Sequence, residues 1–153
     1  MLAAERRRLA GARRSHSMIL YRPTGLAELK LVAATDWTAW PARLPDQPIF
    51  YPVLSVGYAR KIACDWNAND SFSGYIGFVT RFEITEQAAA RYPVQLAGGR
   101  SHGELWVPAA ELADFNRHIV GKIVVVESYP GPEYLGAIDP ETHLPAGFAD
   151  PRG

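Results

Sequence analysis

The stretch SGYIGFVTRFEI, residues 73–84, carries the clearest pattern in the chain, an alternation of apolar and more polar side chains. Successive side chains of a β-strand point to opposite faces of its sheet. One face of this stretch is apolar and consists of Ile76, Phe78, Phe82 and Ile84. The other face is more polar and consists of Tyr75, Val79, Arg81 and Glu83. The alternation predicts a strand with one face on the core, which favours an α+β fold.

Strand and helix patterns alternate on both sides of this stretch. Further strands are predicted at 18–22, 49–54, 104–108 and 122–129, and helices at 25–34, 56–67, 85–91 and 109–119. The expected N-cap residues of the first three helices are Thr24, Ser55 and Thr85. This order could also build a doubly wound parallel sheet, but the first strand is not followed by a glycine-rich phosphate-binding turn. We therefore expect a single α+β domain over residues 18–130.

Two segments are predicted to lack helices and strands. Residues 94–103 are expected to form an exposed loop with Gly98 and Gly99 as its hinge. The segment 131–153 is rich in proline and is expected to lie irregularly over the surface of the domain.

Composition limits the class of protein. The chain has 153 residues, of which 48% are hydrophobic, and this suits one globular domain with one core. Its apolar runs are far shorter than the roughly 20 residues that span a bilayer, so we expect no membrane partner. The lone Cys64 cannot form an internal disulfide, and we expect it to be a buried thiol in a reducing compartment, the cytoplasm.

Charge is unevenly distributed although the formal net charge is zero. Residues 1–17 contain five arginines and one acid, which leaves 11 basic and 15 acidic residues in 18–153. The basic arm is either a disordered extension that touches nucleic acid or an acidic surface, or the result of a start codon placed too early, since Met18 directly precedes the first strand. The mildly acidic remainder does not favour broad electrostatic binding to nucleic acid.

Three segments share features that bear on function: LYRPTG (20–25), IFYPVLSVGYA (49–59) and HGELWVP (102–108). This ordered set resembles the three motifs of the ADP-ribosyltransferase fold. In that family an arginine or histidine ends the first strand, an aromatic or hydroxyl residue lies on a middle strand before a helix, and a glutamate opens a later strand after a mobile loop. Residues 18–130 also resemble a group of small bacterial proteins known as ADP-ribosylation/J-crystallin proteins. The resemblance implies an ADP-ribosyltransferase-like arrangement of split mixed or antiparallel sheets with flanking helices.

The resemblance also implies NAD as the substrate and a role for each matching residue. Breaking the bond between nicotinamide and ribose places positive charge on the sugar, which a nearby carboxylate stabilises. Glu104 is the matching catalytic residue. Arg22 would hold a ribose hydroxyl or a phosphate oxygen, and Tyr51 and Tyr58 would enclose the nicotinamide ring.

Each assignment has a plainer alternative. Glu104 could be a solvated glutamate that begins a strand, and Arg22 a surface arginine or half of a structural ion pair. Tyr58 could pack in the core with Ile62 and Trp66, which follow it at helical spacing. If the catalytic interpretation is right, side chains 22, 51 and 104 should meet around one pocket.

Two positions depart from the family pattern. Pro23 follows Arg22, so the backbone N–H that many members use to bind the nicotinamide amide is missing. His102 stands two residues before Glu104, where arginine-modifying members have glutamate or glutamine. We therefore expect a different acceptor (a nucleic acid, a small molecule or a protein), with His102 as a second catalytic residue that orients or deprotonates it.

Other functions are also compatible with the sequence. The same fold could serve as a non-catalytic binding module, for which Pro23 and the aromatic residues Trp37, Trp40, Tyr51 and Trp106 argue. An NAD-dependent phosphotransferase acting on RNA ends is a further alternative, with Arg22, Arg81 and Arg100 as its basic groove. His16, His102, His118 and His143 show no metal-ligand spacing with Cys64, so no metal site is predicted.

Overall fold

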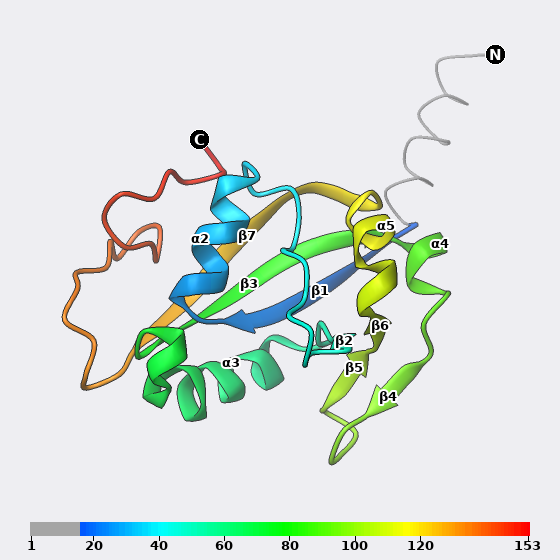
Figure 1. Cartoon of the computed structure of the whole chain (residues 1–153), viewed down its shortest axis with the longest axis horizontal. Coiled ribbons are helices and arrows are strands. Elements are labelled where there is room, and N and C mark those ends of the chain that lie inside the picture. The colour runs from blue at the N-terminus through cyan, green and yellow to red at the C-terminus, as the bar shows by residue number, and fades with distance from the viewer. Residues whose placement is uncertain (1–15) are drawn as a thin grey trace.

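Long antiparallel strands form the centre of the fold in the computed structural model, which describes residues 16–153. They are β1 (Ser17–Thr24), β3 (Ile76–Thr85) and β7 (Ile119–Pro130). β3 lies between the other two and is hydrogen-bonded to both along most of its length (Figure 1). The alternating stretch is therefore confirmed as a strand. It begins at Ile76 because Ser71–Ser73 form a 3-10 turn that ends at Gly74 in a left-handed conformation.

Short pairings extend this sheet beyond β1. β2 (Ile49–Phe50) pairs with β6 (Val107–Pro108), and β4 (Val94–Leu96) pairs with β5 (Gly103–Leu105). Val53 forms bridges to Tyr21 of β1 and to Glu104 of β5. The strand order is therefore β7–β3–β1–(49–54)–β5–β4, and every strand pairing among the described residues is antiparallel. The expected α+β class with antiparallel sheets is confirmed.

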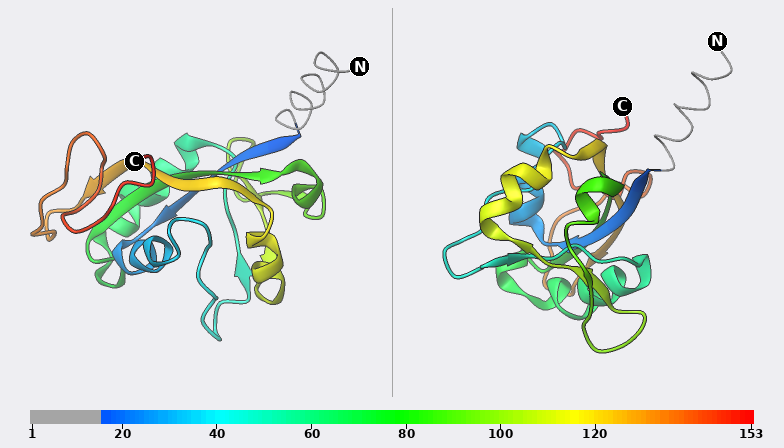
Figure 2. Two further views of the ribbon diagram at one scale, coloured as in Figure 1. Left: turned by 90° about the horizontal axis from the view of Figure 1, so that it is seen from above. Right: turned by 90° about the vertical axis from the view of Figure 1, so that its right-hand side faces the viewer.

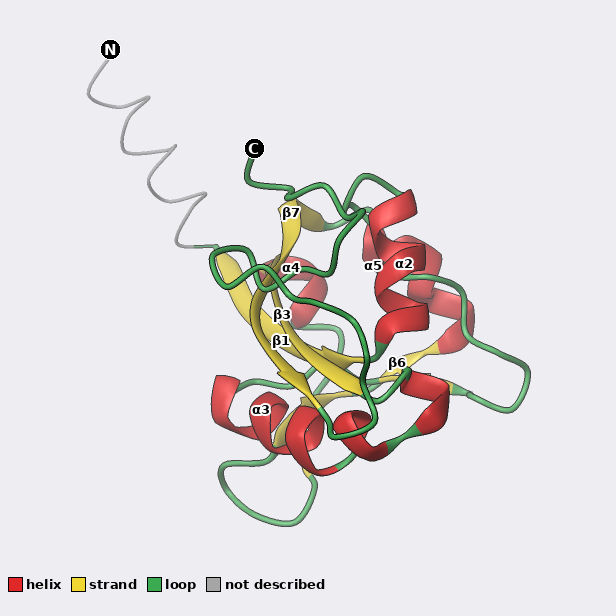
Figure 3. Ribbon diagram, turned by 90° about the vertical axis from the view of Figure 1, so that its left-hand side faces the viewer, coloured by secondary structure: helices red, strands yellow, loops and turns green. Residues whose placement is uncertain are grey.

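Helices cover both faces of the long strands. Figure 3 shows α3 (Val56–Asp65) on one face, and α2 (Leu26–Ala34) and α5 (Leu112–Asn116) on the other. The short α4 (Glu86–Ala89) follows β3 directly. None of the helices in residues 16–153 has the length and apolar character that crossing a membrane would require.

Two of the three expected N-caps are confirmed. The Ser55 hydroxyl accepts a hydrogen bond from Tyr58 N at 3.1 Å, and the Thr85 hydroxyl accepts one from Ala88 N. The prediction for Thr24 is wrong, because Thr24 is the last residue of β1 and Gly25 is the N-cap of α2. A side chain at Gly25 would lie 2.5 Å from the Cβ of Ser73, so the approach of the 3-10 turn excludes a capping side chain there.

The main core lies between the long strands and the helices α2 and α5. It includes the predicted apolar face of β3, namely Ile76, Phe78, Phe82 and Ile84, all at most 1% exposed. Trp40 packs in this core against Phe50 and Phe82, with ring centroids 5.6 and 5.3 Å apart. Burial of these aromatic side chains supplies much of the driving force for folding.

The opposite face of the sheet carries a second, smaller cluster under α3, formed by Val53, Ala59, Ala63 and Val79. α3 lies so near β3 that a Cβ at Gly77 would be 2.4 Å from the Ala63 carbonyl oxygen. Small residues therefore form the buried face of α3. Tyr58 is half-buried and packs against this smaller cluster, so its expected core contact is confirmed in part. Ile62 is only half-buried and Trp66 is exposed, so the three side chains do not form a buried stripe.

The segments expected to be irregular differ from one another. Residues 94–103 are not simply a loop, because β4 and β5 form a hairpin whose turn contains Gly98 and Gly99 at positive φ. The chain after Pro130 contains no helix or strand and returns to the C-terminal end of α2, as Figures 1 and 2 show. The expected basic arm of residues 1–17 lies, except for its last two residues, outside the described part of the chain.

Candidate functional site

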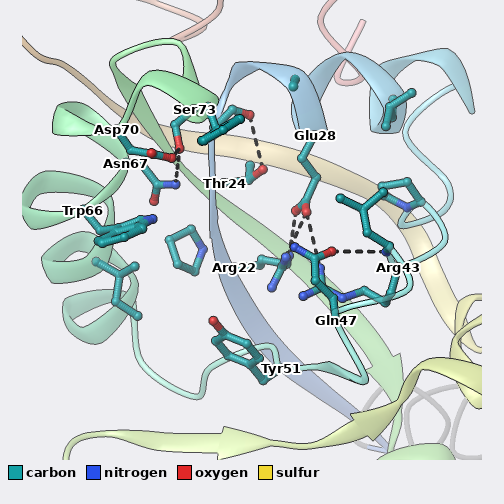
Figure 4. Close-up of a pocket in the computed structure, with 18 of the residues that line it drawn as sticks. Arg22, Thr24, Glu28, Arg43, Gln47, Tyr51, Trp66, Asn67, Asp70 and Ser73 are labelled. Carbon is teal, nitrogen blue, oxygen red and sulfur yellow. Dashed lines mark hydrogen bonds and ion pairs between the residues drawn. The ribbon is translucent and has the colours of Figure 1, made fainter.

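A pocket of about 430 Å³ opens between the end of β1, α2, the end of α3 and the loop after α2 (Figure 4). Its charged and polar lining residues are Arg22, Thr24, Glu28, Arg43, Gln47, Tyr51, Asn67, Asp70 and Ser73. Exposed apolar side chains, those of Leu31, Leu44, Trp66 and Phe72, also line it. The pocket thus combines a polar interior with a large apolar contact surface, as small-molecule sites commonly do.

Arg22 forms a buried ion pair on the pocket wall. Its Nε and Nη2 donate to the two carboxylate oxygens of Glu28 at 2.7 and 2.9 Å, a bidentate arrangement. The guanidinium also lies over the Phe50 ring, 4.6 Å from its centroid. Burial by itself would raise the pKa of Glu28, but the Arg22 charge and hydrogen bonds hold it below its ordinary value. Arg22 is therefore half of a structural ion pair.

A second arginine approaches the same carboxylate from the loop after α2. Arg43 Nη1 lies 3.8 Å from Glu28 Oε1, beyond hydrogen-bond distance, and the Arg43 side chain is only 10% exposed. Its Nε is buried and has no hydrogen-bond partner. Two guanidinium groups thus share one carboxylate, and Arg22 already occupies both oxygens of that carboxylate.

The opposite wall of the pocket carries a polar network. The Asn67 amide donates to Ser73 Oγ at 3.0 Å, and Ser73 Oγ donates to Asp70 Oδ2 at 2.7 Å. Asn67 is 8% exposed, and its Oδ1 is buried without a partner. This wall therefore offers acceptor groups, while the arginine wall offers donors.

Glu104 lies in a separate cluster on the α3 side of the sheet. Tyr58 Oη donates to Glu104 Oε2 at 2.5 Å, and Trp106 Nε1 donates to Glu104 Oε1 at 2.8 Å. Glu104 is 6% exposed and is not the solvated glutamate of the plainer alternative. Burial, followed by the hydrogen bond to Glu104, raises the pKa of Tyr58 to about 12, so the phenol stays protonated and remains a donor. The His102 ring stacks on Tyr58 with centroids 4.4 Å apart.

The five residues singled out from the sequence therefore fall into two groups, and the expectation that side chains 22, 51 and 104 meet around one pocket is wrong. Arg22 and Tyr51 line the pocket, whereas Tyr58, His102 and Glu104 form the cluster, and Glu104 is not among the pocket-lining residues. The register between 49–54 and 103–108 places Tyr51 beside Trp106, which holds the Glu104 carboxylate. Tyr51 and Trp106 are 41% and 46% exposed, so two accessible aromatic side chains on paired strands, here called the aromatic surface, lie between the pocket and the cluster.

Sequence reasoning missed several residues of the pocket. Glu28 belongs to no motif, Asn67 and Asp70 lie in a stretch whose sequence is typical of a polar turn between a helix and a strand, and Arg43 lies in a proline-rich loop without a motif. The helical spacing of Tyr58, Ile62 and Trp66 indicates a shared face, and this face contributes Ile62 and Trp66 to the pocket and Tyr58 to the Glu104 cluster.

Comparison of this chain with protein-family models, with curated proteins and with solved structures finds no match. No group of three or more His, Cys, Asp or Glu side chains within residues 16–153 is arranged to hold a metal ion. Fold and site together define an α+β protein with a charged pocket beside a buried, doubly hydrogen-bonded glutamate.

Proposed function

We propose that this protein has an ADP-ribosyltransferase-like fold, binds NAD and transfers ADP-ribose to an acceptor. The observation that carries the proposal is the adjacency of the three motif segments. Tyr21, Val53 and Glu104 are bridged in succession, although they are separated by 32 and 51 positions in the chain. Residues that the resemblance assigns to one site thus belong to neighbouring strands.

The cluster around Glu104 suits a cationic transition state. A carboxylate in a largely water-excluded position stabilises developing positive charge more strongly than it would in water. Tyr58 and Trp106 fix the orientation of Glu104, which lowers the cost of reorganisation during reaction. His102, stacked on Tyr58 near the β4–β5 turn, is the group that would orient or deprotonate an acceptor.

The pocket suits the remainder of a dinucleotide. Tyr51 and Trp66 present exposed aromatic surface to a planar ring, and the arginine wall presents positive charge to phosphate. The aromatic surface between Tyr51 and Trp106 connects this pocket to Glu104, so an extended ligand could contact both groups.

A non-catalytic binding module is the second candidate. Both oxygens of Glu104 are already engaged by neutral donors, and Arg22 is committed to Glu28. In this case the pocket and the aromatic surface would bind a ligand without turnover. The RNA-end phosphotransferase receives less support, since Arg22 and Arg81 both have carboxylate partners, Glu28 and Glu83.

Titration calorimetry with NAD, together with assays of nicotinamide release, separates these functions. We expect saturable binding and slow nicotinamide release, and we expect Glu104→Gln to reduce the release rate by at least about 100-fold while NAD still binds. Glu111→Gln is the matched control, because Glu111 also accepts a hydrogen bond from a tyrosine, Tyr92, outside the site.

Each outcome has a distinct meaning. Nicotinamide release by Glu104→Gln at the wild-type rate would remove the catalytic assignment. Binding of NAD without release by the wild-type protein would favour the binding module. Absence of NAD binding would contradict the proposal as a whole.

A further inference from the structure

We propose that the pocket beside Arg22 contains an anion-binding subsite in which Arg43 is the ligand-binding residue, so that the pocket takes a small planar organic anion. This inference concerns the chemistry of the pocket and does not depend on NAD being the natural ligand. It follows from the charges around Glu28, the position of Arg43 and the lining of the pocket.

The charges on the arginine wall do not balance. Arg22 and Arg43 contribute two positive charges and Glu28 contributes one negative charge, and all three side chains are at least about four-fifths buried. Arg22 donates to both Glu28 oxygens. Among residues 16–153, the ion-pair partner of Arg43 is a Glu28 carboxylate oxygen 3.8 Å from Nη1, and the Arg43 Nε is buried without a hydrogen-bond partner. A buried charge without a hydrogen-bonded partner is costly. An anion in the pocket would supply the missing partner.

The proline-rich loop after α2, residues 40–48, restricts the position of Arg43 in the absence of a ligand. Prolines at 41, 45 and 48 restrict its backbone, and Leu44 and Gln47 are joined by hydrogen bonds in both directions. At the start of the loop, the backbone of Trp40 exchanges two hydrogen bonds of 2.9 Å with the Asn116 side chain. A cation held in this way loses little conformational entropy on binding an anion.

The remaining lining explains why the anion should carry a planar ring. Tyr51 and Trp66 present exposed rings at the pocket (Figure 4). Phe72, which also lines the pocket, is 91% exposed. On the opposite wall the Asp70 carboxylate, which also accepts a hydrogen bond from Ser73 Oγ, is the acceptor for a donor group on the ring. The pocket thus offers a positive end, aromatic walls and an acceptor end.

The test compares probes of similar size that differ in charge: phenyl phosphate, benzoate and uncharged benzamide, titrated into the full-length protein by NMR. We expect at least one anion to bind at least about 10-fold more tightly than benzamide, and its affinity to fall as salt is added. The phosphate and carboxylate arms identify which anionic group the subsite prefers.

Arg43→Gln is the diagnostic variant and Arg117→Gln its control, because Arg117 is an exposed surface arginine on a different part of the molecule. We expect Arg43→Gln to abolish the preference for the anion and to leave benzamide binding unchanged. The same variant should melt at a temperature equal to or higher than that of the wild-type protein, because it removes an uncompensated buried charge. A retained melting temperature also shows that the variant folds.

The proposal is overturned if the anions bind no better than benzamide, or if Arg43→Gln and Arg117→Gln retain the same anion affinity. Binding of an acidic peptide in the absence of binding by any small anion would also overturn it, in favour of a protein partner. Nicotinamide release from NAD is not part of this test. If the protein releases no nicotinamide, the results expected for the anions and for Arg43→Gln stay the same.

Discussion

At the scale of single residues, the polar side chains of the site are arranged around two carboxylates with different surroundings. Glu28 is paired with charged guanidinium groups, whereas Glu104 is held by the neutral donors of Tyr58 and Trp106. An ion pair fixes the position of charge, while neutral donors leave the negative charge of a carboxylate available to a ligand. Glu28 therefore has a structural role and Glu104 is the better candidate for chemistry.

Replacing Glu28 by glutamine should destabilise the protein strongly. The substitution leaves two buried guanidinium groups without a counter-ion, and breaking one side of a buried ion pair typically costs about 3–5 kcal/mol. Urea denaturation at neutral pH measures the change in the free energy of unfolding. Glu133→Gln, at an exposed position, is the control and should be neutral.

The destabilisation by Glu28→Gln should depend on pH. Because the pKa of Glu28 is lower in the folded protein than its ordinary value of 4.5, its contribution to stability is present above that value and is lost as the pH falls through the lowered pKa. The stability difference between the wild-type protein and Glu28→Gln should therefore shrink under acid conditions. A constant difference between pH 7 and pH 3 would contradict the assigned ion pair.

At the scale of elements, the close packing of α3 on β3 determines which side chains of the helix reach the site. Gly77 allows the contact, since any side chain there would collide with the Ala63 carbonyl. Ala59 and Ala63 then occupy the buried face, and the larger Tyr58 and Trp66 are directed toward Glu104 and the pocket. The hydrogen bond from Tyr58 N to the Ser55 hydroxyl fixes the start of the helix beside β5.

Two glycine substitutions test this packing. Gly77→Ala should lower the free energy of unfolding by about 1–3 kcal/mol, because the new methyl group overpacks the interface between α3 and β3. Gly57→Ala, in the same helix, should raise it by about 0.4–1 kcal/mol, because nothing lies within 4 Å of the added Cβ and the unfolded chain loses freedom. Thermal and urea denaturation measure both. Equal effects of the two substitutions would contradict the close contact at Gly77.

At the scale of the whole molecule, the segment after β7 completes the main core. Leu144 is 3% exposed, and Trp37 Nε1 donates to the Ala149 carbonyl at 3.0 Å. Phe148 packs against the Trp37 ring, with centroids 6.3 Å apart. The segment contains no helix or strand, yet it covers Trp37, which lies just beyond the end of α2. The same helix carries Glu28 on the pocket wall.

Leu144→Ala tests whether this segment contributes to the stability of the domain. Removing a buried leucine side chain should cost about 2–5 kcal/mol, measured by urea denaturation. Leu135→Ala, in the same segment, should be neutral because Leu135 is 97% exposed. If both variants were as stable as the wild-type protein, the segment would not be a part of the cooperative core.

Local interactions account for what could be predicted correctly. The alternation at 73–84 correctly predicted the central strand. Ser55 and Thr85 were correctly predicted as N-caps, because each hydroxyl accepts a hydrogen bond from a backbone N–H three residues further along the chain. The same reasoning wrongly predicted Thr24 as an N-cap. The N-cap of α2 is the next residue, Gly25, and Ser73, which is far away in the sequence, leaves no room for a capping side chain there.

The sequence by itself determined the α+β class, the positions of most strands and helices, and the three segments that contain the candidate site residues. Only the tertiary structure decided that Glu104 is enclosed by Tyr58 and Trp106, that Arg22 is paired with Glu28, and that Arg43 lies unbalanced beside them. The physical reason is that strand and helix patterns depend on near neighbours along the chain. The charge balance and burial of a side chain depend instead on neighbours that the fold brings together from distant positions.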